Sequence, residues 1–172
     1  MSVRREEQHL VVLLEDAPYR SILNGVKNSF NINERVIDAK KPSCGWPKVF
    51  DDLENNIQLL IRYPKCHILL LMDFDDKDKE SLSSFERRKR KLSEITPPEH
   101  AERVFILGVN HKESEALKKY FKTPNLEKIG QELIKDCPTG DLSNWHNTHL
   151  ECNLPEIERM RENGVFDWLF NT

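Results

Sequence analysis

Short apolar runs alternate along the chain with longer segments in which apolar residues recur every three or four positions. The runs at 9–14, 67–72 and 103–109 have the length and the composition of strands that are buried on both faces. A weaker strand is predicted at 34–39. Between the runs, the helical spacing of apolar residues predicts helices at 18–30, 49–62, 80–95 and 113–121.

Strands and helices therefore alternate, which is typical of an α/β fold. The pattern predicts a mostly parallel four-stranded sheet with helices on both faces, within a single domain that spans 1–172. Its core covers about 9–121, and a helical C-terminal extension covers about 122–172. The last short helix is expected from about residue 155 and ends in the apolar stretch 166–170.

The composition fits a globular domain and limits the kinds of partner that the chain can have. Of 172 residues, 38% are hydrophobic and 32% charged, and the net charge of −3 excludes a polycation that coats nucleic acid. No apolar run approaches the ~20 residues of a membrane helix, and the N-terminal residues lack the apolar stretch of a secretory signal. Four scattered cysteines form no CxxC pair, so we expect reduced thiols and a cytoplasmic protein.

Acidic residues follow two of the predicted strands directly. Glu15 follows the run at 9–14, and Asp73 and Asp75 follow the run at 67–72 with one residue between them. The carboxyl ends of parallel strands meet at one edge of a sheet, and that edge is where such sheets bind ligands. In extended backbone Asp73 and Asp75 share a side, while Phe74 points to the other. Carboxylate oxygens prefer Mg²⁺ or Mn²⁺, so we predict a metal site at this acidic edge, formed by Glu15, Asp73 and Asp75.

For any single acid here, a helix cap or a solvated loop is the ordinary interpretation. Asp16 is predicted to cap the helix that follows the first strand, with Pro18 in its first turn. The hypothesis of a metal site depends on the three carboxylates as a set.

The acid after the first strand and the Asp-x-Asp after the third resemble the TOPRIM domain of topoisomerases, primases and OLD-type nucleases. The resemblance covers roughly 10–121, and in it Glu15 matches the family glutamate while Asp73 and Asp75 match the Asp-x-Asp pair. It implies Mg²⁺ binding and chemistry at phosphodiester bonds, with the glutamate in acid–base work. The family glutamate is usually followed by glycine, whereas this chain has Asp16.

The loop after the fourth strand offers further candidates. Small stand-alone TOPRIM-like proteins carry an acid there, a place that Glu113 or Glu115 could fill and at which either could help to hold a second ion. Lys112 could screen negative charge in the transition state. His111 could assist proton transfer, although a surface histidine is the commoner outcome.

Five consecutive basic residues, 87–91, lie on the helix predicted after the acidic loop. Consecutive side chains splay around a helix, so only two or three could face one ligand. Arg87, Arg88 and Arg90 are the candidates for contacts with a nucleic-acid backbone. The alternative is a solvated helix whose cations offset the neighbouring aspartates.

Two other acidic folds fit less well. A phospho-receiver domain would use Glu15, Asp16, Asp73 and Lys112, but the loop after Asp73 is more acidic than a phosphoacceptor site needs. An EF-hand is excluded because Lys77 occupies its third ligand position and no glycine follows.

The C-terminal extension contains a possible zinc set. Cys137, His146, His149 and Cys152 include three residues at intervals of three, which could place the two histidines on one helical face. Structural zinc sites usually present a tighter paired knuckle, so zinc is the weaker hypothesis.

The resemblance implies Mg²⁺-dependent hydrolysis of phosphodiester bonds, of nuclease type. Because the chain has no GxxxxGK[ST] loop, a separate ATPase is the expected partner. Of the two nucleic acids, DNA is expected as the substrate before RNA. The alternative is a TOPRIM-like scaffold that has lost catalysis and serves a nucleic-acid-processing or prokaryotic defence assembly. The missing glycine after Glu15 and the aromatic C-terminus favour this alternative.

Overall fold

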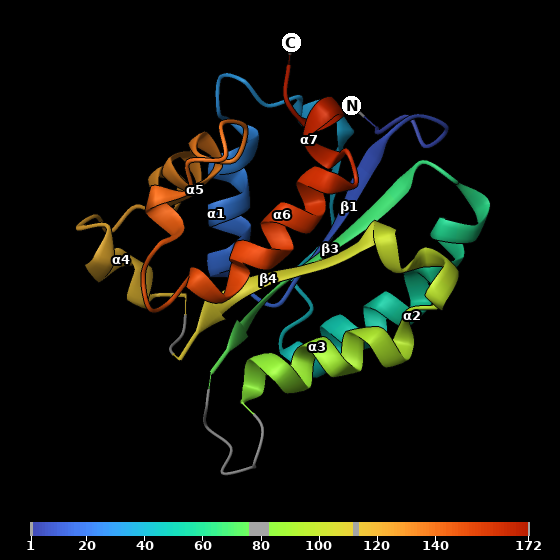
Figure 1. Ribbon diagram of the computed structural model, residues 1–172, viewed down its shortest axis with the longest axis horizontal. Coiled ribbons are helices and arrows are strands. Elements are labelled where there is room, and N and C mark those ends of the chain that lie inside the picture. The colour runs from blue at the N-terminus through green and yellow to red at the C-terminus, as the bar shows by residue number, and fades with distance from the viewer. Residues whose placement is uncertain (1, 76–82, 112–113, 172) are drawn as a thin grey trace.

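A four-stranded, all-parallel sheet forms the centre of the protein in a computed structural model, which describes residues 2–75, 83–111 and 114–171 (Figure 1). The strand order is β2-β1-β3-β4. The bounds are β1 His9–Leu14, β2 Ile37–Ala39, β3 Cys66–Phe74 and β4 Val104–Asn110. The predicted α/β class and the parallel sheet are confirmed.

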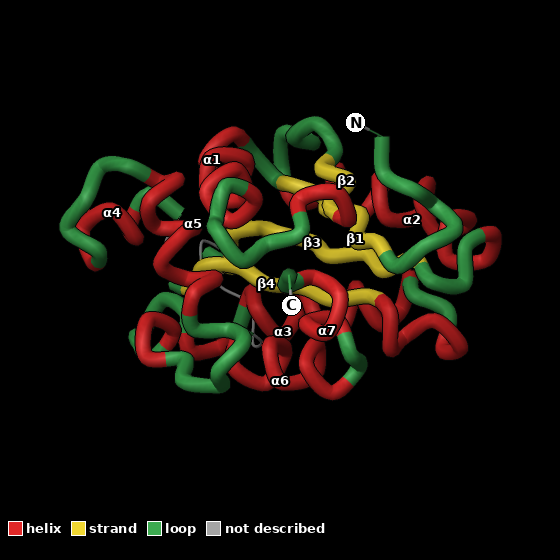
Figure 2. Tube along the Cα trace, turned by 90° about the horizontal axis from the view of Figure 1, so that it is seen from above, coloured by secondary structure: helices red, strands yellow, loops and turns green. Residues whose placement is uncertain are grey.

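Helices cover both faces of this sheet, as Figure 1 shows. On one face lie α1 (Ala17–Lys27), α5 (Leu126–Lys135), α6 (Leu154–Glu162) and α7 (Val165–Leu169). On the other lie α2 (Trp46–Arg62) and α3 (Ser84–Ile95). The short α4 (Ala116–Tyr120) lies at the side beside α5, away from the strands (Figure 2).

The central strands are apolar throughout because each face of the sheet packs on helices. In β1, Leu10, Val12 and Leu14 belong to the core under α1 and α5. Val11 and Leu13 belong to the core under α2 and α3. All six residues of β1 are buried, so the run shows no alternation of apolar and polar residues.

The predicted elements differ from the structure mainly at their ends. Of the strand predicted at 34–39, only β2 is extended, and Glu34–Val36 forms a 3-10 turn. The predicted C-terminal helix is two helices, because Gly164 adopts a left-handed backbone with φ 74° between α6 and α7. Of the helix predicted at 113–121, residues 114–121 are described, and the helical part of these is the short α4.

Helices α1 and α5 cross at very close range. A β-carbon at Gly25 would lie 1.9 Å from the carbonyl oxygen of Glu127, and one at Gly130 would lie 2.0 Å from that of Ile22. Any larger residue would force the two backbones apart. The two glycines therefore permit the contact that covers this half of the sheet.

The C-terminal extension closes the outer edge of β4 with hydrogen bonds to two side chains and one main-chain carbonyl. Asn153 forms two hydrogen bonds with Gly108, from the Gly108 N–H to Oδ1 at 2.9 Å and from Nδ2 to the Gly108 carbonyl at 2.7 Å. Glu156 accepts a hydrogen bond from the Ile106 N–H at 3.0 Å. The carbonyl of His149 accepts one from the Asn110 N–H at 2.8 Å. These contacts replace a fifth strand, since an open strand edge would otherwise present unpaired backbone groups.

Candidate functional site

Strands β1 and β3 end side by side and bring Glu15 next to Asp73. Leu14 pairs with Leu71 in register, and the Glu15 N–H donates to the Leu71 carbonyl at 3.0 Å. Strand β3 runs further than β1 and ends at Phe74, so Asp73 lies within it. The acidic edge predicted from the sequence is therefore an arrangement that this sheet produces.

Glu15 completes the strand ladder with its side chain. Its Oε2 atom accepts a hydrogen bond from the Asp73 N–H at 2.6 Å. In a regular parallel ladder that N–H would meet the main-chain carbonyl of Glu15. Here the carbonyl turns away and accepts hydrogen bonds from the N–H groups of Cys44 at 2.9 Å and Gly45 at 3.3 Å. One carboxylate of the site thus also terminates the pairing of β1 with β3.

Asp73 is a buried carboxylate with 7% of its surface exposed. Its Oδ1 atom accepts a hydrogen bond from the Tyr19 hydroxyl at 2.6 Å and another from the Ser114 N–H at 3.0 Å. The same Tyr19 oxygen accepts from the Val109 N–H at 3.2 Å. The carboxylate is therefore held by α1 and by the residues that follow β4.

Burial raises the pKa of Asp73 from 3.8 to about 7, against the lowering effect of the hydrogen bond from Tyr19. The negative charge of Glu15 raises it further. Burial also raises the pKa of Glu15, opposed by the hydrogen bond from the Asp73 N–H. The pKa of Tyr19 lies well above its ordinary value because the hydroxyl is buried beside Asp73. Near neutral pH, the site is therefore poised to hold or release a proton on Asp73.

At the end of β3, Phe74 points to the opposite side of the sheet from Asp73, as expected. Phe74 is fully buried in the core under α2 and α3, where its ring meets that of Phe85 edge to face at 5.2 Å. Asp73 faces α1 on the other side. Asp75 is half-buried, its negative charge raises the pKa of Glu15, and its carbonyl accepts a hydrogen bond from Ser84 at the start of α3.

A buried arginine accompanies these acids. Arg88 is 3% exposed, and its guanidinium lies 3.6 Å from the centre of the Trp46 ring, a cation–π contact. Trp46 opens α2 directly after Gly45, whose N–H is bonded to Glu15. The positive charge of Arg88 lowers the pKa of Glu15, so it partly offsets the acidic edge.

The other members of the basic run lie in different surroundings. Arg87 is partly buried and donates from Nη2 to the hydroxyl of Ser84 at 3.1 Å, whereas Arg90 is exposed. The three predicted nucleic-acid contacts thus do not share one surface, since Arg88 lies in the interior. Arg88 also differs from the alternative of a solvated helix, because it is buried, and the charge that it partly offsets is that of Glu15.

The structure describes some of the candidate residues that follow β4 and not others. Lys112 and Glu113 lie outside the described residues, and so does Lys77. Glu115 is exposed and forms an ion pair with Lys118. His111 is exposed, adopts a left-handed backbone with φ 67°, and its Nε2 lies 3.2 Å from Nδ2 of Asn110.

Within residues 2–75, 83–111 and 114–171, no group of three or more His, Cys, Asp or Glu side chains is placed to hold a metal ion. In the extension, the Cys137 thiol is directed to the Leu133 carbonyl at 3.6 Å, and His149 Nδ1 donates to the Asn110 carbonyl at 3.4 Å. The zinc set is therefore not assembled in this conformation.

At the acidic edge, the donor atoms suit a hard ion, because they are carboxylate oxygens. However, Oε2 of Glu15 accepts one hydrogen bond and Oδ1 of Asp73 accepts two. A cation would also have to displace the proton that Asp73 retains near neutral pH. The chemistry of the residues fits Mg²⁺, provided that Asp73 ionises.

Tyr19 and Trp46 were not identified as site residues from the sequence. Tyr19 falls on the apolar stripe of α1, and its hydroxyl was the only signal of a polar role. The second helix is predicted from residue 49, whereas α2 begins at Trp46. Asp16, by contrast, caps α1 as predicted, with Oδ1 accepting from the Tyr19 N–H at 3.4 Å.

No protein-family model matches the chain, and no curated protein or solved structure is significantly similar to it. Among the described residues, no helix is both long and apolar enough to cross a membrane. The functional argument therefore depends on the geometry of the acidic edge.

Proposed function

We propose that the chain hydrolyses phosphodiester bonds with the help of Mg²⁺ or Mn²⁺ at a TOPRIM-like acidic edge. One observation carries the proposal. The carboxylate of Glu15 lies 2.6 Å from the backbone nitrogen of Asp73, so the acid after β1 meets the Asp-x-Asp segment of β3. Charges of one sign are costly to gather unless a cation or a basic group offsets them.

Each residue has a distinct role in this proposal. Glu15, Asp73 and Asp75 would hold the ion, which when bound neutralises phosphate charge and lowers the pKa of water. Tyr19 fixes the Asp73 carboxylate through its hydroxyl. Glu15, whose pKa is raised by burial, is the candidate for proton transfer. Arg88 offsets part of the negative charge from within the fold.

The test is cleavage of bis(p-nitrophenyl) phosphate and of labelled DNA and RNA strands in the presence of Mg²⁺ or Mn²⁺. Glu15→Gln keeps an oxygen that can accept from the Asp73 N–H, and Asp75→Asn keeps the shape of its side chain. Each should lower the rate on the order of 100-fold or more. Asp51→Asn, at an exposed position on α2, is the matched control. Absence of cleavage by the unmodified chain, or cleavage by both variants at the rate of the unmodified chain, would contradict the proposal.

A scaffold without catalysis is the second candidate, and one observation favours it. The Asp73 carboxylate is already engaged by Tyr19 and Ser114, and its pKa of about 7 leaves it partly protonated. Titration calorimetry with Mn²⁺ separates the two functions. A scaffold should bind no ion at the acidic edge and should still form a stable complex with its partner.

The partner and the location belong to the same proposal. We propose that the chain belongs to a cytoplasmic assembly with an ATPase and nucleic acid, with DNA as the substrate before RNA. A separate ATPase is expected because the chain carries no nucleotide-binding loop of its own. Comparison of cleavage rates on DNA and RNA strands tests the order of preference.

A further inference from the structure

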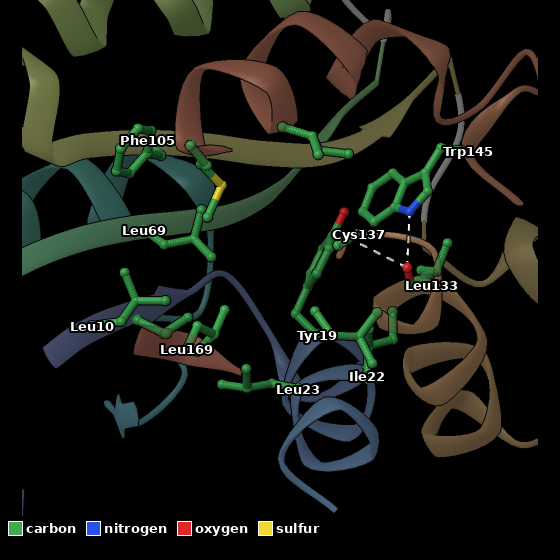
Figure 3. Close-up of a cluster of buried hydrophobic side chains, with 14 of the residues drawn as sticks. Leu10, Tyr19, Ile22, Leu23, Leu69, Phe105, Leu133, Cys137, Trp145 and Leu169 are labelled. Carbon is green, nitrogen blue, oxygen red and sulfur yellow. Dashed lines mark hydrogen bonds between the residues drawn. The ribbon is translucent and has the colours of Figure 1, made fainter. Parts of the chain in front are cut away.

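An apolar cavity of about 110 Å³ lies between the sheet and the helices on its α1 face. Leu10 and Leu69 border it from the strands, Tyr19 and Ile22 from α1, and Leu133 and Trp145 from α5 and the segment after it (Figure 3). It is therefore bordered by elements that are far apart in the sequence.

Two residues of the central strands border the same space. Leu71 in β3 and Leu107 in β4 are only partly buried, although strands and helices surround them. Leu10 and Leu69, on the same face, are 3% and 6% exposed. The exposed surface of Leu71 and Leu107 fits side chains that border the cavity.

The polar atoms around this cavity are committed to other partners. The Tyr19 hydroxyl donates to Asp73, and Nε1 of Trp145 donates to the Leu133 carbonyl at 3.0 Å. The thiol of Cys137 is directed to the same carbonyl at 3.6 Å. A water in such a site lacks the two to four polar partners that it needs, so apolar cavities of this kind stay dry.

We infer that the cavity binds a small, uncharged apolar molecule of about the size of benzene. Its volume far exceeds the roughly 10–15 Å³ that one water needs, and it approaches that of apolar cavities of about 150 Å³ that bind benzene or xenon. Charged or strongly polar molecules are excluded because they would lose their hydration without gaining hydrogen bonds. This inference is independent of any chemistry at the acidic edge.

Benzene is the probe for the test, with pyrazine as a polar molecule of the same shape. We expect the melting temperature to rise with benzene concentration, since a ligand of the folded state stabilises it. In methyl NMR spectra, the signals of Leu71, Leu107 and Leu133 should shift, whereas pyrazine should cause neither effect. No rise and no shift with benzene, or equal binding of pyrazine, would overturn the inference.

Leu71→Phe should fill the cavity and weaken benzene binding about tenfold or more. Ile61→Phe is the matched control, because Ile61 is 57% exposed on α2, and it should bind benzene like the unmodified chain. If Leu71→Phe does not fold, Leu133→Ala provides the second test, since a larger cavity should admit indole as well as benzene. Unchanged benzene binding in a folded Leu71→Phe, or exclusion of indole by Leu133→Ala, would place the ligand elsewhere and overturn the inference.

Discussion

The hydroxyl of Tyr19 donates a hydrogen bond of 2.6 Å to the carboxylate of Asp73, across 54 positions of the sequence. The same oxygen accepts from the Val109 N–H, so one side chain of α1 links the ends of β3 and β4. Its ring borders the apolar cavity while its hydroxyl supports the acidic edge. Tyr19 therefore connects the interior of the sheet to the candidate site.

Tyr19→Phe should raise the pKa of Asp73 above about 7, because the hydrogen bond that favours its ionised form is lost. The substitution also leaves the buried Val109 N–H without this partner, so we expect a loss of about 1–3 kcal/mol in the free energy of unfolding. Carboxyl NMR titration measures the first effect and urea unfolding the second. Tyr120→Phe, at a position 44% exposed, is the control and should change neither. A lower pKa of Asp73 in Tyr19→Phe would contradict the prediction.

Asp73→Asn should stabilise the fold at neutral and alkaline pH. The pKa of Asp73 is raised from 3.8 to about 7, so the folded state binds more protons than the unfolded state between these values. The stability that this protonation contributes is present below pH 3.8 and is lost as the pH rises through about 7. A shift of about three units corresponds to roughly 4 kcal/mol at most. Asparagine keeps an oxygen for Tyr19 and Ser114 without the charge.

Urea unfolding between pH 4 and pH 8 checks this prediction, with Asp51→Asn as the surface control. The advantage of Asp73→Asn over the unmodified chain should grow with pH and level off above about pH 7. An Asp73→Asn protein that is less stable than the unmodified chain at pH 8 would show that the ionised carboxylate is well accommodated.

The fold and the meeting of the acids could be predicted because strong local patterns encode them. The run before Asp73 is long, apolar and followed by Asp-x-Asp, and the parallel sheet then brings Glu15 to the same edge. The side-chain partners could not be predicted. Arg88 reads as one of five solvated cations, and its burial depends on Trp46, which lies on another helix.

The closure of the β4 edge could not be predicted from the sequence either. Asn153 and Glu156 belong to a polar stretch without a strand pattern, yet both are buried against β4. Hydrogen bonds between side chains and a distant backbone leave no periodicity in the sequence. The local patterns therefore indicate which strands form, but not which side chains complete them.

Gly25→Ala should destabilise the protein strongly, because its β-carbon would lie 1.9 Å from the Glu127 carbonyl oxygen. Helices α1 and α5 would have to separate, and overpacking of this kind costs about 1–3 kcal/mol or more. Thermal unfolding measures the loss. Asn24→Ala, one position earlier on the same helix, is the control and should have little effect. If Gly25→Ala unfolds at the temperature of the unmodified chain, the two helices lie further apart than described.

His67 should make the protein less stable as the pH falls from neutral to acid. Burial lowers its pKa from 6.5 to about 4, although its Nδ1–H donates to the Lys65 carbonyl. The centre of its ring lies 6.5 Å from that of Phe105 and 5.2 Å from that of Trp168, so a charge there would be poorly solvated. The unfolded state therefore binds more protons between pH 4 and pH 6.5, and stability is lost as the pH falls through this window.

This slope has the opposite sign to that of Asp73, and the two overlap between pH 4 and pH 6.5. In the unmodified chain the two effects on stability oppose each other and partly cancel, whereas single variants separate them. His67→Gln should lose less stability than the unmodified chain on acidification, by up to roughly 3 kcal/mol near pH 4. Asp73→Asn should lose more stability than the unmodified chain on acidification. His146→Gln is the control for His67, since the side chain of His146 is exposed. If His67→Gln and the unmodified chain follow one pH profile, the imidazole is solvated and the packing of Phe105 and Trp168 around it is looser than described.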